Sequence, residues 1–166
     1  PPPNGFEMRR LMSLDPQLAS IPFIFLTALT GIDDRVTGIR DGADDYVTKP
    51  FSPRELTARV KSAFRRLSTQ AATGGQFPIL SFKNIVIDKE SRRVTVNDSP
   101  IDLTSIEFDL LYTLAENRGR VLTREQLLEK VWGGEYFGEM RVVDVHLGHV
   151  RQKLGKEDFI VTVRGV

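Results

Sequence analysis

Apolar positions follow two different patterns along the chain, one before residue 70 and one after it. Residues 21–27 form a short apolar run rich in β-branched and aromatic side chains, which predicts a strand buried on both faces, as in a parallel sheet. Residues 45–48 predict a second short strand. Residues 6–14 and 33–40 are typical of helices, the second closed by Gly42.

The next helix has a marked start. Ser52 can cap it, Pro53 suits its first position, and Glu55 completes a capping box. Apolar residues then recur on one helical face, at Leu56, Val60, Ala63, Phe64 and Leu67. Strands that alternate with helices predict an α/β fold with a parallel sheet.

Residues 68–76 contain Ser, Thr, Gln, Ala and Gly without periodicity, which predicts a linker. We therefore expect two domains, at residues 1–67 and 77–166.

The second domain begins with predicted antiparallel strands at 79–88 and 92–96, a turn at 97–100 and a short strand at 101–103. Capping boxes at Thr104/Glu107 and Thr123/Gln126 start two helices. A third helix spans 140–154 and ends at Gly155, and residues 159–165 are strand-like. Strands, three helices and a terminal hairpin predict an α+β winged helix-turn-helix with an N-terminal antiparallel sheet.

Composition narrows the class of protein. The 166 residues include no cysteine, which excludes disulfides and thiolate metal sites and suits a reducing cytoplasm. No apolar run reaches the ~20 residues of a membrane-spanning helix. Net charge is +1, but residues 71–166 hold 13 basic and 14 acidic side chains. Any basic surface for nucleic acid must therefore be local.

Thr27, Tyr46 and Lys49 form a candidate site in the first domain. A hydroxyl and a lysine at the carboxyl ends of parallel strands meet where such sheets bind ligands, and Lys49 could neutralise a phosphate. Pro50 could hold a cis bond that directs Lys49. On spacing alone, a surface lysine before a turn and a threonine that ends a core strand are the favoured explanation.

The helix at 140–154 is a candidate DNA reader. Its inward stripe is apolar, at Val143, Leu147, Val150 and Leu154. Its outward side carries Arg141, Asp144, Gly148 and Arg151, with His146, His149 and Lys153 beside them. Such a helix can enter the major groove, although a solvated polar face is the commoner explanation of this pattern.

His146 and His149 are three residues apart and could share a metal, with Asp144 near them. A metal site needs three or four ligands, and the chain has no other histidine. The remaining ligands would have to be carboxylates. We expect no metal site, no catalytic constellation and no enzyme, with a metal-dependent enzyme that uses His146 and His149 as the weaker alternative.

The motif Gly-Ala-Asp-Asp-Tyr-Val-Thr-Lys-Pro-Phe at residues 42–51 resembles the end of an OmpR/PhoB-type receiver domain. Residues 4–7, 25–28 and 55–59 sit at that family's distances, and residues 141–146 and 162–166 resemble its recognition helix and wing. The resemblance implies a partial flavodoxin-like receiver followed by a winged helix. Thr27 would sense a phosphoryl group, Lys49 would pair with it and Tyr46 would swing.

The resemblance also implies partners. The phospho-accepting aspartate and the acidic pair that holds Mg²⁺ would lie upstream of Pro1, and a sensor histidine kinase would supply the phosphoryl group. Arg35 with Glu55, and Asp45 with Arg59, would form cross-subunit pairs in a receiver homodimer. The loop 133–139, with Glu135, Tyr136 and Phe137, would contact RNA polymerase, unless its aromatics pack inward.

On double-stranded DNA, the resemblance assigns His146 and Arg151 to phosphates and directs Arg141 and positions 148–149 towards bases. We group His149, Lys153 and Arg164 with these DNA-binding residues. Gly148-His149 departs from the basic pair of many relatives, so no sequence preference can be transferred. We expect a DNA-binding transcriptional regulator. The alternative is a winged-helix module that binds another protein.

Overall fold

A computed structural model describes residues 4–15, 17–19, 21–28, 43–68, 79–134, 139–155 and 158–164. The predicted helix at 33–40, and almost all of the predicted linker 68–76, lie outside these residues. In the described part of the chain, no helix is both long enough and apolar enough to span a membrane.

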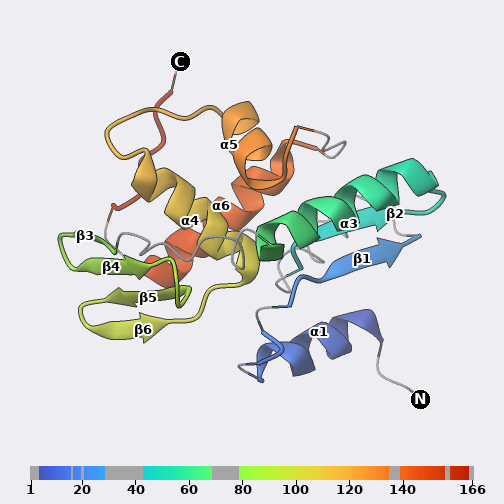
Figure 1. Cartoon of the computed structure of the whole chain (residues 1–166), viewed down its shortest axis with the longest axis horizontal. Coiled ribbons are helices and arrows are strands. Elements are labelled where there is room, and N and C mark those ends of the chain that lie inside the picture. Colours follow the sequence, from blue (N-terminus) through green and yellow to red (C-terminus); the bar gives the residue numbers. More distant parts are fainter. Residues whose placement is uncertain are drawn as a thin grey trace.

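The first region builds a short parallel sheet. Strands β1 (Ile24–Thr27) and β2 (Asp45–Thr48) pair in parallel, with Ile24 opposite Asp45 and Thr27 opposite Thr48. Helices α1 (Gly5–Ser13) and α3 (Pro53–Ser68) lie on opposite sides of these strands (Figure 1). The parallel α/β architecture predicted from the sequence is therefore confirmed.

Two details of this region differ from the prediction. The strand predicted at 21–27 is shorter, and Leu26 is exposed, so β1 is not buried on both faces. At the start of α3, the backbone N–H of Glu55 donates to Oγ of Ser52, as a capping box requires. Oε1 of Glu55, however, accepts hydrogen bonds from Arg59 one turn later.

The second region begins with an antiparallel sheet in the order β3 (Leu80–Phe82), β4 (Ile85–Asp88), β5 (Arg93–Val96), β6 (Ser99–Ile101). The single strand predicted at 79–88 is in fact two, because Lys83 adopts a positive φ of 51° and the chain turns back. Asn97 and Asp98 also have positive φ, as a two-residue hairpin turn requires, so β6 starts earlier than predicted.

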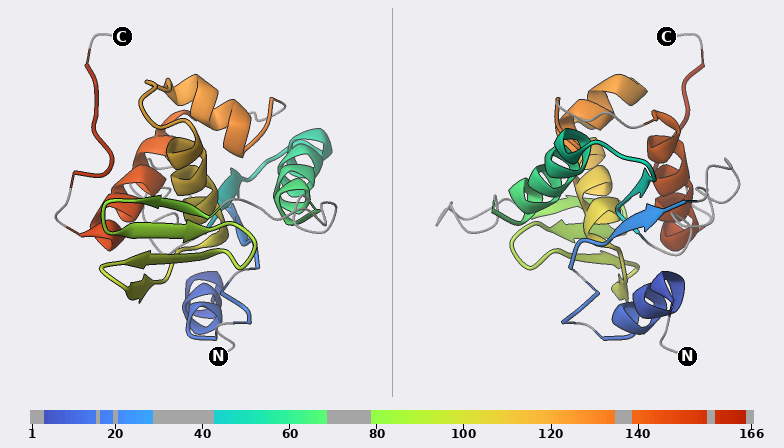
Figure 2. Two further views of the ribbon diagram at one scale, coloured as in Figure 1. Left: turned by 60° about the vertical axis from the view of Figure 1, so that its left-hand side comes forward. Right: turned by 90° about the vertical axis from the view of Figure 1, so that its right-hand side faces the viewer.

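Three helices follow this sheet: α4 (Ser105–Glu116), α5 (Arg124–Val131) and α6 (Arg141–Leu154). Helices α4 and α6 supply the side chains that pack on the sheet, and α5 packs on these two helices. Both predicted capping boxes are present, and Gly155 ends α6 with a φ of 88°. Figure 2 shows α4 and α6 packed side by side over the four strands. Residues 158–164 form no strand with any described part of the chain, so the terminal strand predicted at 159–165 is not observed there.

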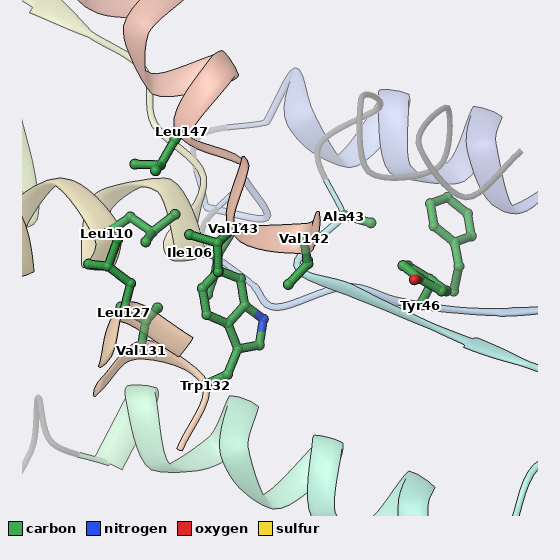
Figure 3. Close-up of a cluster of buried hydrophobic side chains, with 11 residues drawn as sticks. Ala43, Tyr46, Ile106, Leu110, Leu127, Val131, Trp132, Val142, Val143 and Leu147 are labelled. Atoms are coloured by element: carbon green, nitrogen blue, oxygen red, sulfur yellow. The ribbon is translucent and has the colours of Figure 1, made fainter. Parts of the chain in front are cut away.

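Two clusters of buried side chains form the core. One joins the sheet to α4 and the end of α6, through residues such as Ile87, Leu111 and Val150. The other surrounds Trp132, which is 1% exposed and lies against Val142 and Val143 (Figure 3). This second cluster also includes Phe25, Ala43 and Tyr46 of the first region. Trp132 is therefore a core residue.

Candidate nucleic-acid interface and signalling surface

Helix α6 has one apolar and one polar face. Val143, Leu147, Val150 and Leu154 are buried, as their spacing predicts, and they pack the helix onto α4 and α5. Arg141, Asp144, Gly148, Gln152 and Lys153 are exposed along the other side. The helix therefore presents a polar surface, with a cation at each end, to whatever approaches it.

The cations on this surface differ in how they are held. Arg141 is exposed, whereas Arg151 is half-buried and donates to the Ile160 carbonyl at 3.2 Å and to Oγ1 of Thr162 at 2.8 Å. Arg151 therefore fastens α6 to the segment that leads to Arg164. Arg164 is itself exposed.

Sequence reasoning missed one cation of this surface. Arg124, in the first turn of α5, donates from Nε to both Asp144 oxygens, at 2.9 and 3.0 Å. This ion pair joins the two helices of the helix-turn-helix and raises the pKa of Arg124 through its hydrogen bond to Asp144. In the sequence, Arg124 directly follows the predicted N-cap Thr123, and this position places it in the first turn of the helix.

The two histidines of α6 lie at its inner edge. His146 is fully buried, with its ring 5.7 Å from that of Trp132, so here the structure departs from the expectation that His146 contacts a phosphate. The reason is that the buried stripe of α6 is wider than predicted and includes Val142, one turn before His146. His149 lies half-buried beside Glu107 of α4, with Nδ1 3.6 Å from Oε1.

Glu107 is a buried carboxylate beneath this helix, with a side chain only 1% exposed. Its Oε2 accepts from the Thr104 N–H at 2.8 Å and from Nζ of Lys153 at 2.6 Å. Burial alone would raise the pKa of Glu107, but His149, Lys153 and the Thr104 N–H together outweigh burial and lower the pKa to about 2. The ammonium group of Lys153 therefore contacts Glu107 of α4, while the Lys153 side chain remains partly exposed to solvent.

In the first region, Thr27 and Lys49 meet at one edge of the parallel sheet, as predicted. The Lys49 N–H donates to the Thr27 carbonyl at 2.7 Å, and the Lys49–Pro50 bond is cis. Lys49 is exposed, whereas Tyr46 is buried at 8%. A hydroxyl and an ammonium group at the carboxyl ends of parallel strands can bind an anion.

The same edge does not fit the Mg²⁺ that the family resemblance implies. Oδ2 of Asp44 accepts from the Phe23 N–H at 2.7 Å. Both oxygens of Asp45 accept from Nη1 of Arg59. The carboxylates of Asp44 and Asp45 are therefore already engaged by these contacts.

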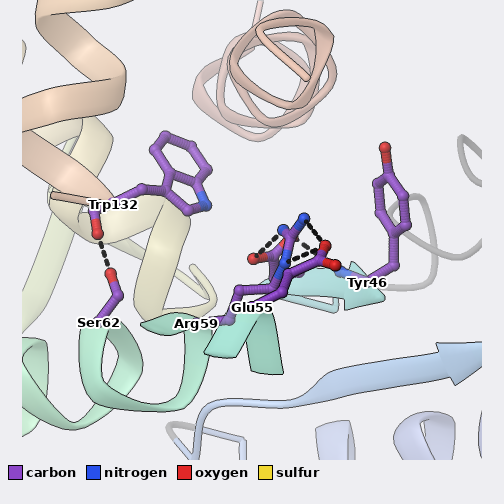
Figure 4. Close-up of polar contacts among 6 residues, drawn as sticks. Tyr46, Glu55, Arg59, Ser62 and Trp132 are labelled. Atoms are coloured by element: carbon purple, nitrogen blue, oxygen red, sulfur yellow. Dashed lines mark hydrogen bonds and ion pairs between the residues drawn. The ribbon is translucent and has the colours of Figure 1, made fainter. Parts of the chain in front are cut away.

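Asp45, Glu55 and Arg59 form a connected ion-pair network in a single chain (Figure 4). Nη1 of Arg59 lies 2.8 Å from Asp45, and Nη2 lies 2.9 Å from Glu55. The side chains of Asp45 and Arg59 are 4% and 5% exposed. The structure thus pairs Asp45 with Arg59 within one subunit, where a pair across two subunits was expected. Arg35 lies outside the described residues.

The network borders a contact between the two regions. Oγ of Ser62 in α3 donates to the Trp132 carbonyl (Figure 4).

Across the molecule, α1 and the polar face of α6 line an open pocket, to which Asn4, Arg10, Arg141, Gly148 and Gln152 contribute. The surface predicted to read DNA therefore faces α1 in this arrangement. The predicted polymerase-contacting residues Glu135, Tyr136 and Phe137 lie outside the described residues.

Comparisons with known proteins agree with both regions. Residues 1–61 match the response regulator receiver domain, and residues 98–166 match the C-terminal domain of transcriptional regulatory proteins. The phosphate regulon transcriptional regulatory protein PhoB of Klebsiella pneumoniae is 40% identical over 98% of this chain and 70% of its own. The uncharacterized transcriptional regulatory protein YclJ of Bacillus subtilis is 44% identical over 90% of this chain and 67% of its own.

Among solved structures, a RitR mutant is similar with a TM-score of 0.72 and 32% identity. The similarity covers 94% of this chain and 71% of that protein. These matches extend over both regions.

Proposed function

This chain belongs to the OmpR/PhoB-type response regulators, which join a receiver domain to a DNA-binding domain and regulate transcription, and from this premise we propose how it does so. The domains are residues 1–67 and 77–166, joined by a linker at 68–76. In the second domain, α6 enters the major groove. In the first, phosphorylation of an aspartate upstream of Pro1 controls dimerisation and promoter binding, with a sensor histidine kinase as the phosphoryl donor in the cytoplasm.

The observation that supports DNA reading is the polar face of α6. Arg141, at the start of the helix, is exposed and near the bases of a groove that α6 would enter. Arg124 and Arg151 flank it and are suited to phosphates, because each is fixed by a second contact. Lys153, His149 and Arg164 extend this cationic surface. His146 supports it from inside by packing on Trp132.

The Asp45–Arg59 network supports the control of dimerisation. A buried carboxylate and guanidinium that already pair within the subunit can exchange partners across a two-fold axis at little cost, because both remain paired. Arg35 and Glu55 would form the other ion pair across the two-fold axis. The loop at 133–139 would contact RNA polymerase.

The DNA-binding proposal is tested by fluorescence anisotropy with a pool of random duplexes, followed by sequencing of the bound fraction. We expect the chain to select a repeated half-site, and the double variant Arg141→Ala/Arg151→Ala to lose selection. Arg93→Ala, which removes one positive charge from an exposed position of β5, is the control for loss of charge and should bind as the wild type does. A folded wild type that selects no sequence would instead favour the protein-interaction module.

Dimerisation needs a separate test, in a protein that contains the phospho-accepting aspartate. Sedimentation should show that a small-molecule phosphodonor tightens the dimer, and that Glu55→Ala, which removes the partly exposed member of the network and leaves the Asp45–Arg59 pair in place, weakens this effect. An unchanged dimerisation constant in folded Glu55→Ala would rule out the proposed interface.

A further inference from the structure

Two histidines and a glutamate converge between α4 and α6. His146 and His149 are one turn apart on α6, and Glu107 approaches them from α4. One ligand atom from each residue lies within 4.8 Å of the other two. The sequence offered the histidine pair but not the third ligand, because Glu107 is 39 residues away from His146 along the chain.

The donor set suits zinc and related ions. Two imidazoles and one carboxylate are a common Zn²⁺ ligand set, with water completing the coordination. Ligands at ~2.0–2.1 Å from a tetrahedral ion lie roughly 3.4 Å apart, so these side chains would need to close by about an ångström. Changes in the χ angles of His149, which is only partly buried, can supply this movement.

The carboxylate is already oriented for such a role. Oε2 of Glu107 accepts from the Thr104 N–H and from Lys153, whereas Oε1 faces Nδ1 of His149 at 3.6 Å. Hydrogen bonds to the outer oxygen hold a ligating carboxylate in position, as outer-sphere partners do in metalloproteins. Glu107 and His149 also line the open pocket between α1 and α6, which gives an ion and a water molecule a path to the site.

We propose that Glu107, His146 and His149 bind one divalent transition-metal ion, such as Zn²⁺, which clamps the recognition helix α6 to α4. Glu107 ligates through Oε1, while Oε2 keeps its contacts with Thr104 and Lys153. Lys153 limits the affinity, because its ammonium group lies close to the bound cation and repels it. The site does not depend on phosphorylation or on DNA.

The test uses the full chain without a histidine tag. Isothermal titration with ZnCl₂ should give one ion per chain, and titration with CoCl₂ should give the intense visible absorption of tetrahedral Co²⁺. His149→Gln should weaken Zn²⁺ binding at least tenfold. Zn²⁺ should raise the Tm of the wild type but not that of His149→Gln.

A matched pair isolates the carboxylate. Glu107→Gln keeps an oxygen for the Thr104 N–H but loses the anionic ligand, and it should lose Zn²⁺ affinity. Glu116→Gln removes an exposed carboxylate from the same helix and should not. Circular dichroism establishes that each variant is folded. The proposal is overturned if the folded wild type binds no Zn²⁺, or if His149→Gln binds Zn²⁺ as tightly as the wild type.

Discussion

In residues 79–164, three helices and a four-stranded sheet close over two apolar clusters, whereas in residues 4–68 many comparable side chains remain in contact with solvent. Phe64 is 62% exposed and Leu26 is 44% exposed, yet Ile106 and Leu110 are fully buried. The exposed apolar residues of the second region lie at its ends and loops, such as Val121 and Val161. Apolar burial therefore stabilises the second region far more than the first.

The first region relies instead on polar contacts and on its neighbour. Asp45 and Arg59 form a buried pair there, and Phe25 and Tyr46 share a cluster with Trp132 of the second region. We infer from this difference that residues 79–164, which contain the DNA-binding helix α6, can fold without the first region. The receiver-like half depends on charge pairing and on contacts outside its own residues.

The largest expected effect comes from breaking the buried ion pair. Arg59→Ala leaves the Asp45 carboxylate buried without its main cation, which should cost about 3–5 kcal/mol. Urea unfolding of the whole chain, followed by circular dichroism, measures this loss. If Arg59→Ala were as stable as the wild type, the first region would not depend on its ion pair.

A matched pair of leucines compares the apolar interiors directly. Leu110→Ala in α4 should cost about 2–5 kcal/mol, because it opens a cavity in a closed core. Leu26→Ala in β1 should cost less than about 1 kcal/mol, because that side chain is already half in water. Equal losses in thermal and urea unfolding would contradict the contrast between the two regions.

A pH dependence is expected in the second region. The pKa of Glu107 falls from 4.5 to about 2 on folding, so its ionised form stabilises the native state. That stability is complete above the unfolded pKa and is lost as the pH falls from about 4.5 through 2, with a total on the order of 3 kcal/mol.

Urea unfolding of the wild type and of Glu107→Gln between these pH values, with a metal chelator present, measures this contribution. The advantage of the wild type should shrink steadily as the solution becomes more acidic. A constant difference between the two proteins across that range would show that Glu107 does not carry the pH dependence.

Local signals predicted much of this structure. The starts of α4 and α5 were predictable from Thr104 and Thr123, because an N-cap and its capping-box partner are only three residues apart. Gly155 likewise predicted the end of α6. The split between β3 and β4 was missed, because nothing in the sequence shows that Lys83 adopts a positive φ. A turn of this kind is set by the pairing of the strands on either side.

The candidate sites were harder to predict where they depend on distant contacts. The two predicted strands placed Thr27 and Lys49 at one edge of the sheet, because the carboxyl ends of parallel strands lie at the same edge. It could not show that His146 is buried against Trp132, or that Glu107 faces His149. The first fact depends on how α6 packs against the end of α5, and the second on how α6 packs against α4. Periodicity within one helix says nothing of its neighbour.

The most direct test of the self-sufficient DNA-reading unit is anisotropy of residues 77–166 alone on the duplex selected by the whole chain, at increasing salt. We expect this piece to fold and to bind at least as tightly as the whole chain. We also expect a similar decrease in log K with log salt, because the proposed phosphate contacts all come from this region. A folded piece that fails to bind the duplex, or a salt dependence much weaker than that of the whole chain, would show that DNA binding needs the first region.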